Sequence, residues 1–430
     1  MHKNKISTSP WRWMPTTFFM EGFPGVMIMV VTSIMYKNLG LSNERITLYT
    51  GLLTLPWVIK PLWASLVDIY KCKAWWIYVT QLLMGASFVA LAFSLQSGES
   101  YFFPASLACC WAVAFCSASH DIAADGYYLV ELDPSKQAFF LGFQSAAYQI
   151  GKILAQGILV MFAGYLFTRL NNYFDVWSIV LAIAGGVCLL VGLYHKIILP
   201  RDHTLVAKPN LRETWNNFVL VYQEFFKLEG VWFAVLFLLL FRFGEQLLSP
   251  MIPLFLLDKV SAGGLDLGNQ FTGFAYGSCS PLAILFGGLL GGYVIYRNGF
   301  KRWIWPMVFI INIPHTLYVV LAYLQIRDPM LVLPVILIEQ FCFSFGFAAY
   351  MMFLMYAVRN SKFKTAHYSF FSGLMLLGLM IPKMLSGWLQ SVMGYTNFFI
   401  LILFMIIPAM ILIPFLKMDA SYGKRSTVKA

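Results

Sequence analysis

The sequence predicts an all-helical integral membrane protein in which twelve spanning helices form two six-helix halves. Of its 430 residues, 60% are hydrophobic and only 11% are charged, which is too little charge to cover the surface of a soluble protein of this size. The apolar runs are about 20 residues long, the length that a helix needs to cross a bilayer. Backbone groups in lipid must be hydrogen-bonded within the chain, so continuous runs of this kind predict helices.

Twelve such runs follow one another, separated by short polar stretches. Their boundaries follow from where the apolar run ends and turn or charged residues begin. They span approximately residues 14–36, 46–67, 74–95, 103–129, 138–166, 176–199, 231–257, 270–296, 303–325, 330–357, 367–392 and 396–416.

The basic residues predict how the helices are oriented. If the chain crosses the membrane twelve times, 21 of the 30 Lys and Arg residues lie on the side that holds both termini. Cytoplasmic loops are enriched in Lys and Arg, so both termini are expected in the cytoplasm and the chain in the cytoplasmic (inner) membrane. The net charge of +11 is thus explained by insertion into a lipid bilayer, and no nucleic-acid partner is expected.

A long polar and basic stretch divides the chain into two halves. Residues 1–199 are expected to form the first six-helix bundle, 200–230 a cytoplasmic linker, and 231–430 the second bundle with a cytoplasmic tail. At an offset of 231 residues, Phe139–Gly142 aligns with Phe370–Gly373, and Lys152 aligns with Lys383. Two matches at one offset indicate duplicated halves related by a pseudo-two-fold axis, as in the major facilitator fold.

Acidic side chains occur in every third apolar segment. Glu21 lies in the first, Asp121 and Asp125 in the fourth, Glu245 in the seventh and Glu339 in the tenth. A charge inside a bilayer costs several kcal/mol on most scales, so such residues are rare unless they have a use. In a transporter built from three-helix repeats, these helices surround the central cavity, which predicts a transport site there.

Asp121 and Asp125 are four residues apart, so they share one face of a helix. Two neighbouring carboxylates in a low dielectric resist double ionisation, and one of them then holds a proton, which suits proton coupling. Two alternatives stay open. Asp125 could be a solvated acid at the interface, and Asp121 could form a structural pair with Lys60 or Lys152.

Arg242 and Glu245 are three residues apart and form a possible ion pair. As a functional pair, the guanidinium would bind a substrate carboxylate while Glu245 takes the proton. As a structural pair, the two charges would only neutralise each other. Pro250 and Pro253 follow and predict a break in the helix that could serve gating.

Several other residues complete the expected site. Pro24, within the Gly22–Gly25 cluster after Glu21, predicts a helix break. Glu339 is expected either to bind substrate or to be solvated near the outer face. Three lysines also lie within apolar segments, Lys60, Lys152 and Lys383. Together with Arg242 they balance the charge of the buried acids, which predicts a mixed-charge cavity for an anionic or zwitterionic substrate.

Several stretches, in matching order, resemble the AmpG-type muropeptide permeases, in the family that also contains acetyl-coenzyme A transporters. These stretches are Phe19 to Pro24; Val58 to Trp63 followed by Asp68; Asp121 to Asp125; Arg242-x-Gly-Glu245; and Glu339 with Gly346 to Ala349, then Asn360 and Ser361. The resemblance implies a proton-coupled symporter that imports anhydro-muropeptides during cell-wall recycling. It also implies that Asp68 helps to gate the two halves.

The chain departs from that family at Gly126–Tyr128, where the family tends to have a small residue, Trp and a basic residue, so the substrate stays open. An acyl-coenzyme A or a siderophore is the alternative cargo. A membrane enzyme acting on lipid-linked glycans would need a large outward loop with an acid cluster, and a sensor would not transport. The sequence contains no catalytic constellation, phosphate loop or metal motif, so we expect no enzyme activity and no cofactor beyond the proton gradient. We expect the protein to be a monomer.

Overall fold

The computed structural model describes residues 9–60, 63–64, 67, 71–97, 101–132, 134–200, 219–220, 223–361, 364–416, 418–419 and 422. Within these residues every regular element is a helix, and ten helical spans are long and apolar enough to cross a membrane. The chain divides into two compact units. The N-terminal unit comprises Met1–Gly40 and Leu53–Pro209, and the C-terminal unit comprises Leu41–Leu52 and Asn210–Ala430.

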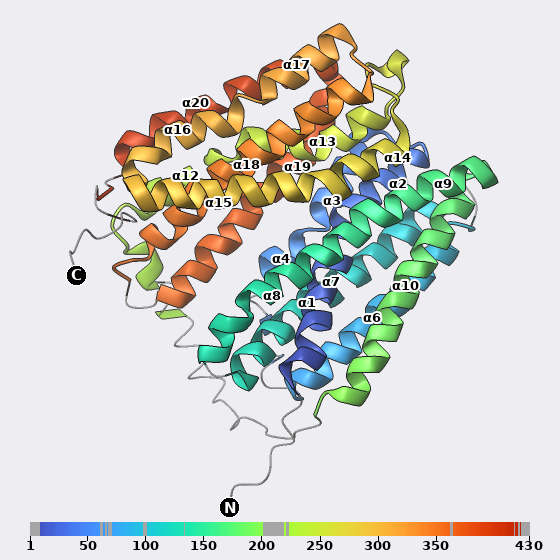
Figure 1. Ribbon diagram of the computed structural model, residues 1–430, viewed down its shortest axis with the longest axis horizontal. Coiled ribbons are helices and arrows are strands. Elements are labelled where there is room, and N and C mark those ends of the chain that lie inside the picture. The colour runs from blue at the N-terminus through green and yellow to red at the C-terminus, as the bar shows by residue number, and fades with distance from the viewer. Residues whose placement is uncertain are drawn as a thin grey trace, which may run out of the picture. The chain divides into compact units, whose positions relative to one another are not determined.

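The N-terminal unit is a bundle of long helices that pack pairwise, with α6 against α7 and α10, and α1 against α8 (Figure 1). A π-helical turn joins α1 to α2 and another joins α8 to α9. Its helices are α1 (Pro10–Val26), α2 (Thr32–Asn38), α4 (Leu55–Ile59), α6 (Lys73–Ser94), α7 (Phe102–Glu131), α8 (Pro134–Lys152), α9 (Val160–Leu170) and α10 (Tyr173–Ile198).

The C-terminal unit packs α15 and α16 against α18, and α13 and α3 against α19 (Figure 1). Its core is rich in aromatic side chains, such as Phe237, Phe353 and Phe371. Its helices are α3 (Asn43–Leu52), α12 (Val231–Phe241), α13 (Phe243–Leu257), α14 (Gly268–Gly273), α15 (Ser280–Asn298), α16 (Phe300–Asn312), α17 (His315–Leu324), α18 (Pro329–Ala357), α19 (Lys364–Phe404) and α20 (Ile406–Leu412).

Several predicted segments differ from the single helices that the hydropathy pattern suggests. The second one is interrupted by a turn between α3 and α4, because Pro56 has no N–H to continue the hydrogen-bond ladder of α3. The eleventh and twelfth follow each other within α19, whose backbone leaves helical geometry at Gly394, with φ 73° and ψ 169°. Such a positive φ is readily adopted by glycine, so the chain changes direction there without a polar loop.

The first and seventh segments are interrupted at other residues than the prolines where breaks were predicted. Helix α1 runs through Pro24, and the backbone widens into the π-helical turn only at Met27–Val31. Helix α13 runs through Pro250 and Pro253, and the seventh segment is interrupted at Arg242, with φ −108° and ψ 10°. The prediction of breaks at Pro24 and Pro250 was therefore wrong. Proline in a membrane helix is tolerated where neighbouring groups satisfy the freed backbone.

Glycines set the close approach of α1 and α8. A Cβ added at Gly22 would lie 2.2 Å from the carbonyl oxygen of Tyr148, and one at Gly151 would lie 2.5 Å from that of Phe19. Backbones can meet this closely only where no side chain stands between them, as small residues allow in membrane helices. This contact places Glu21 of α1 and Lys152 of α8 next to one helix–helix seam.

Candidate functional site

Three acidic side chains gather in the N-terminal unit, and we call Glu21, Asp121 and Asp125 the acidic cluster. Glu21 comes from α1, and the two aspartates come from one face of α7. Each of the three lies within electrostatic range of Lys60, which follows α4. Within the described residues no ion pair joins Lys60 to these acids, so the lysine offsets their charge without being bound to any one of them.

The acidic cluster contains carboxylate oxygens that lack protein partners. Trp57 donates a hydrogen bond from Nε1 to Asp121 Oδ2 over 2.8 Å. Asp121 Oδ1 and Glu21 Oε1 are buried and accept no hydrogen bond from the described part of the chain. Buried polar atoms are nearly always hydrogen-bonded in native proteins, so these two oxygens are places where a proton, a water molecule or a ligand donor would bind.

Helix α8 contributes two further side chains next to the acidic cluster. Tyr148 lies within electrostatic range of both Asp121 and Glu21, and the residue as a whole is 38% exposed. The Lys152 ammonium lies 5.9 Å from the centroid of that ring, at the outer limit of a cation–π contact. Lys152 is thus placed beside the tyrosine rather than paired with Asp121, and its predicted role in binding substrate stays a prediction.

The C-terminal unit carries the predicted pair of Arg242 and Glu245. Arg242 Nη2 lies 2.8 Å from Glu245 Oε2, and Arg242 Nε donates to the same oxygen over 2.9 Å. The side chains are only 10% and 5% exposed. Gln246 also donates from Nε2 to Glu245 Oε2. Arg242 lies at the interruption between α12 and α13, and its side chain contacts Glu245 in the first turn of α13.

Aromatic rings enclose the Arg242 guanidinium. Its carbon lies 4.9 Å from the ring centroids of both Phe343 and Phe347, and 5.7 Å from that of Tyr350. All three rings come from α18, at spacings of three to four residues that place them on one side of the helix. Cation–π contacts stabilise a desolvated cation by about 2 kcal/mol or more, so the rings stabilise the guanidinium in addition to its ion pair with Glu245.

Glu339 also lies on α18, and it is only 2% exposed. Gln340 donates a hydrogen bond from Nε2 to Glu339 Oε2 over 2.7 Å. Glu245 lies within electrostatic range of this carboxylate, as do Tyr276 and the fully buried Tyr318. The structure thus places Glu339 in the protein interior, and the alternative of a solvated acid near the outer face is wrong.

The other predicted site residues lie on α1, α13 and α19 or outside the described residues. Lys383 is partly buried on α19. Pro250 lies inside α13, and Pro24 inside α1. Asp68 lies outside the described residues, so its predicted gating role stays a prediction.

Two buried polar networks were not predicted from the sequence. In the N-terminal unit, Gln81 bridges two histidines: its Oε1 lies 2.8 Å from His195 Nδ1, and its Nε2 lies 2.9 Å from His120 Nε2. Thr16 Oγ1 lies 2.8 Å from His195 Nε2, so the network ties α1, α6, α7 and α10 together. Its members are spread over more than 170 residues, and no local spacing indicates that they meet.

The second network lies in the C-terminal unit, where α3 packs against α13 and α19. Asn43 donates from Nδ2 to Asp258 Oδ2 over 2.9 Å and to Gln390 Oε1 over 3.0 Å. Tyr395 donates to the same Asp258 oxygen over 2.6 Å. We call these four residues the Asn43 network. In the sequence, the only signal for this network is an Asn just before the second apolar segment, and an Asn in that place is equally typical of a helix N-terminus.

Comparisons with known proteins agree with this architecture. The sequence profile of the Major Facilitator Superfamily matches residues 16–366. The anhydromuropeptide permease of Escherichia coli (strain K12) is 22% identical over 403 residues, covering 92% of this chain and 76% of the permease. The match confirms the resemblance that the ordered motifs predict.

Solved structures of transporters share the fold at low sequence identity. A bacterial homologue of the human lysosomal transporter Spinster superposes with a TM-score of 0.68 at 15% identity, covering 95% of this chain and 96% of that one. A D-xylose–proton symporter superposes with a TM-score of 0.69 at 12% identity, covering 96% and 98%. These likenesses confirm the predicted fold class.

Proposed function

The chain belongs to the Major Facilitator Superfamily and is a membrane transporter, and we propose that it imports anhydro-muropeptides with protons. The cargo would be amino sugars that carry a short peptide, taken up across the cytoplasmic membrane with both termini of the chain in the cytoplasm. The Escherichia coli relative named as an anhydromuropeptide permease supports this substrate class. The mixed charge of the two side-chain groups described above supports it independently, because a peptide-bearing sugar has carboxylates, amides and hydroxyls.

The observation that carries proton coupling is the pair of buried, unpartnered oxygens in the acidic cluster. Asp121 Oδ1 and Glu21 Oε1 have no hydrogen-bond donor in the described protein, while Lys60 is the cation in range of both residues. Neighbouring carboxylates in a low dielectric share a proton rather than ionise together. A proton bound at Asp121 would therefore lower the net negative charge of the cluster and supply one missing donor.

The Arg242–Glu245 pair would couple the substrate to a second proton site. A guanidinium binds a carboxylate well, and a carboxylate of the peptide would compete with Glu245 for Arg242. Glu245 would then lose its cation while Glu339 stays nearby, and two such acids favour uptake of a proton. The rings of Phe343 and Phe347 would hold Arg242 in place during this exchange.

The test separates energised uptake from substrate exchange. The purified chain is placed in proteoliposomes, and labelled anhydro-muropeptide uptake is measured under an imposed pH gradient and, separately, as counterflow with equal pH on both sides. We expect Asp121→Asn and Glu245→Gln to lose concentrative uptake by at least about tenfold, the size of one lost charged interaction. Counterflow is expected to continue, because exchange does not require net proton movement.

Matched controls remove an acid of the same type elsewhere. Asp175→Asn changes a partly exposed residue in the first turn of α10, and Glu44→Gln changes an exposed residue of α3. Both are expected to transport like the parent protein. Full pH-driven accumulation by both Asp121→Asn and Glu245→Gln would refute the proton assignment. Counterflow of an acyl-coenzyme A or an iron chelate, without counterflow of anhydro-muropeptide, would refute the substrate class.

A further inference from the structure

The backbone is interrupted between α12 and α13, at the residue that carries the guanidinium of the proposed cargo site. Arg242 has φ −108° and ψ 10°, and its N–H donates to the Leu240 carbonyl oxygen. In an uninterrupted helix that N–H would bond to the carbonyl oxygen of Leu238, four residues earlier. The interruption therefore deprives Leu238 of its helical donor, and a carbonyl group inside a membrane protein needs another one.

Tyr350 of α18 supplies that donor. Its hydroxyl donates a hydrogen bond to the Leu238 carbonyl oxygen over 2.9 Å, and the bond is buried. The tyrosine is only 1% exposed, so bulk water has little access to the bond. A donor from a neighbouring helix is one of the ways in which a membrane helix tolerates a break. The hydroxyl thus stabilises the interrupted backbone at the place where the Arg242 side chain leaves it.

The ring of Tyr350 contacts the same interruption. It stacks on Phe241, the last residue of α12, with ring centroids 5.3 Å apart and planes 18° apart. The Arg242 guanidinium carbon lies 5.7 Å from the centroid of the tyrosine ring. The ring of Phe347, which makes a closer cation–π contact with Arg242, has its centroid 5.9 Å from that of Tyr350. One side chain therefore contacts both the backbone and the guanidinium of the interruption.

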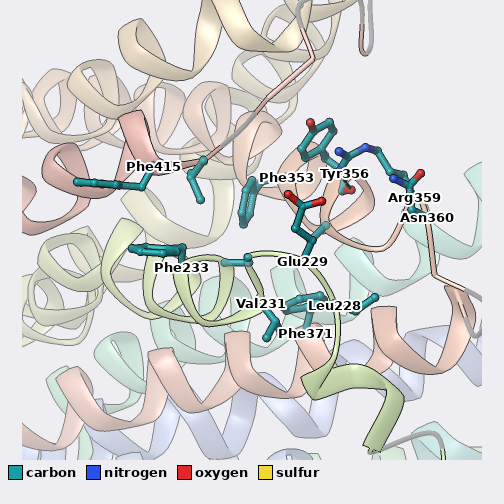
Figure 2. A pocket seen from close by; sticks show the side chains of 14 residues that line it. Leu228, Glu229, Val231, Phe233, Phe353, Tyr356, Arg359, Asn360, Phe371 and Phe415 are labelled. Carbon is teal, nitrogen blue, oxygen red and sulfur yellow. Dashed lines mark hydrogen bonds between the residues drawn. The ribbon is translucent and has the colours of Figure 1, made fainter.

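Aromatic contacts fix the position of Tyr350 along α12. Phe237 and Phe353 pack edge to face with their centroids 4.7 Å apart, about one turn before Phe241 and one turn after Tyr350. Figure 2 shows Phe353 on the wall of a cavity at the start of α12. The ring contacts between α12 and α18 thus extend from that cavity to the interruption. They set the height at which the tyrosine hydroxyl meets the Leu238 carbonyl.

The face of α18 that carries Tyr350 also carries the other surroundings of the guanidinium. Glu339, Phe343 and Phe347 precede the tyrosine at successive spacings of four, four and three residues, which places the four side chains along one side of the helix. The two phenylalanines contact the cation, and Glu339 lies within electrostatic range of Glu245. A shift of the interrupted backbone would therefore move the guanidinium relative to all of them.

We propose that Tyr350 is a positioning residue of the transport site, and this inference rests on the proposed role of Arg242 in binding a cargo carboxylate. The tyrosine hydroxyl fixes the interrupted backbone, so the guanidinium is presented to Glu245 before the cargo binds and to the cargo carboxylate afterwards. Tyr350 acts through Arg242 and needs no contact with the cargo. A guanidinium that is displaced from this position binds more weakly, because a bidentate contact depends on its geometry.

Hydrogen–deuterium exchange of the purified full chain tests the first step without any cargo. Tyr350→Phe keeps the ring and removes only the hydroxyl. Exchange in the peptide covering residues 238–247 should accelerate by about twofold to tenfold, the effect of one lost neutral hydrogen bond on local opening. Tyr36→Phe is the matched control, because Tyr36 is equally buried in the N-terminal unit and its hydroxyl lies 2.9 Å from Ser106 Oγ. It should leave this peptide unchanged.

A double-variant cycle tests whether the hydroxyl acts on Arg242. Glu245→Gln removes the carboxylate that Arg242 contacts and should itself accelerate exchange in the same peptide. In the Tyr350→Phe background, that additional acceleration should be at least about threefold smaller than in the parent. The reason is that a guanidinium no longer held at its position loses less when its partner is removed.

Uptake kinetics give the functional readout. In proteoliposomes, Tyr350→Phe should raise the KM for labelled anhydro-muropeptide by about threefold to tenfold, because a displaced guanidinium loses part of one charged hydrogen bond. Vmax should stay within about twofold of the parent value. A merely structural role would instead lower Vmax with the amount of folded protein and leave KM unchanged. Tyr36→Phe should match the parent in both constants.

Three results would overturn the proposal. The first is parental exchange of residues 238–247 in Tyr350→Phe. The second is an equal effect of Glu245→Gln in both backgrounds, which would show that the hydroxyl does not act on Arg242. The third is an unchanged KM in Tyr350→Phe, or an equal rise of KM in Tyr36→Phe. Failure of the parent chain to take up anhydro-muropeptide would instead refute the proposed function, and the two exchange experiments, which contain no cargo, would still decide whether Tyr350 positions Arg242.

Discussion

The Asn43 network allows a quantitative prediction about how α3 is held on the C-terminal unit. Leu41–Leu52 lies in that unit although the chain before and after it lies in the other. Asn43 donates to Asp258 and Gln390, and the Gly387 N–H donates to Thr47 Oγ1 over 3.0 Å. Asn43→Ala removes these two bonds and the third contact of Nδ2, with Tyr395 Oη over 3.0 Å, and it leaves the contact of Thr47 intact.

The expected magnitude follows from the partners of Asn43. A hydrogen bond to a charged group contributes about 1.5–3 kcal/mol and one to a neutral group about 0.5–1.5 kcal/mol. Asp258 is 9% exposed and Gln390 8%, so water replaces the lost donor poorly. Asn43→Ala should therefore destabilise the docked position of α3 by about 2–4 kcal/mol, which corresponds to an opening constant about 30-fold to 700-fold larger.

Hydrogen–deuterium exchange of the peptide covering residues 43–52 measures that opening directly. Amides that exchange through local opening report the local free energy, so exchange in α3 should accelerate by the factor given above. Asn397→Ala is the matched control, because Asn397 lies exposed on α19 and donates one bond of 3.1 Å to the Met393 carbonyl oxygen. It should leave α3 unchanged. If Asn43→Ala also left α3 exchange within about twofold of the parent, the Asn43 network would not hold the helix.

Two further predictions concern buried polar groups. Arg242→Gln and Glu245→Gln should each lower the unfolding free energy by about 3–5 kcal/mol, because each leaves a buried charge without its partner. The double variant should lose clearly less than the sum of the two single losses. Additive losses in a detergent unfolding titration would contradict the pairing. Gln81→Leu removes the bridge between His120 and His195 and should cost about 2–6 kcal/mol, about 1–3 for each orphaned ring nitrogen; an unchanged melting temperature would show that the bridge does not stabilise the bundle.

The fold was predictable because the bilayer restricts the choices so strongly. Continuous apolar runs allow only helices, and the pair of matches at one offset indicated duplicated halves. The failures occurred at prolines and at the second segment. Pro24 and Pro250 are accommodated within helices, whereas Pro56 stands at the start of α4, just after the turn that follows α3. Whether a proline interrupts a membrane helix depends on which neighbouring groups satisfy the freed carbonyl, and that information lies in other helices.

The site was predictable as far as helical spacing reaches. The three-residue spacing of Arg242 and Glu245 predicted a pair, and the structure shows that pair. Spacing could not predict that Trp57 bonds to Asp121 or that rings of α18 enclose Arg242, because these contacts join separate segments. Aromatic residues are also common throughout the sequence, so no pattern distinguished the rings that touch the site from those that face lipid.

Counting buried acids against buried bases predicted a site with little net charge, but the structure distributes those charges unevenly. In the N-terminal unit, three acids lie near Lys60, and two of their oxygens accept no hydrogen bond from the described residues. In the C-terminal unit, Arg242 and Glu245 neutralise each other. The first arrangement is suited to gain a proton and the second to exchange a partner. A substrate carboxylate that takes Arg242 leaves Glu245 beside Glu339, so binding of an anionic cargo should itself raise the proton affinity of the C-terminal unit. A cationic cargo would have no such effect, so the proposed coupling favours an anionic cargo such as a peptide-bearing sugar.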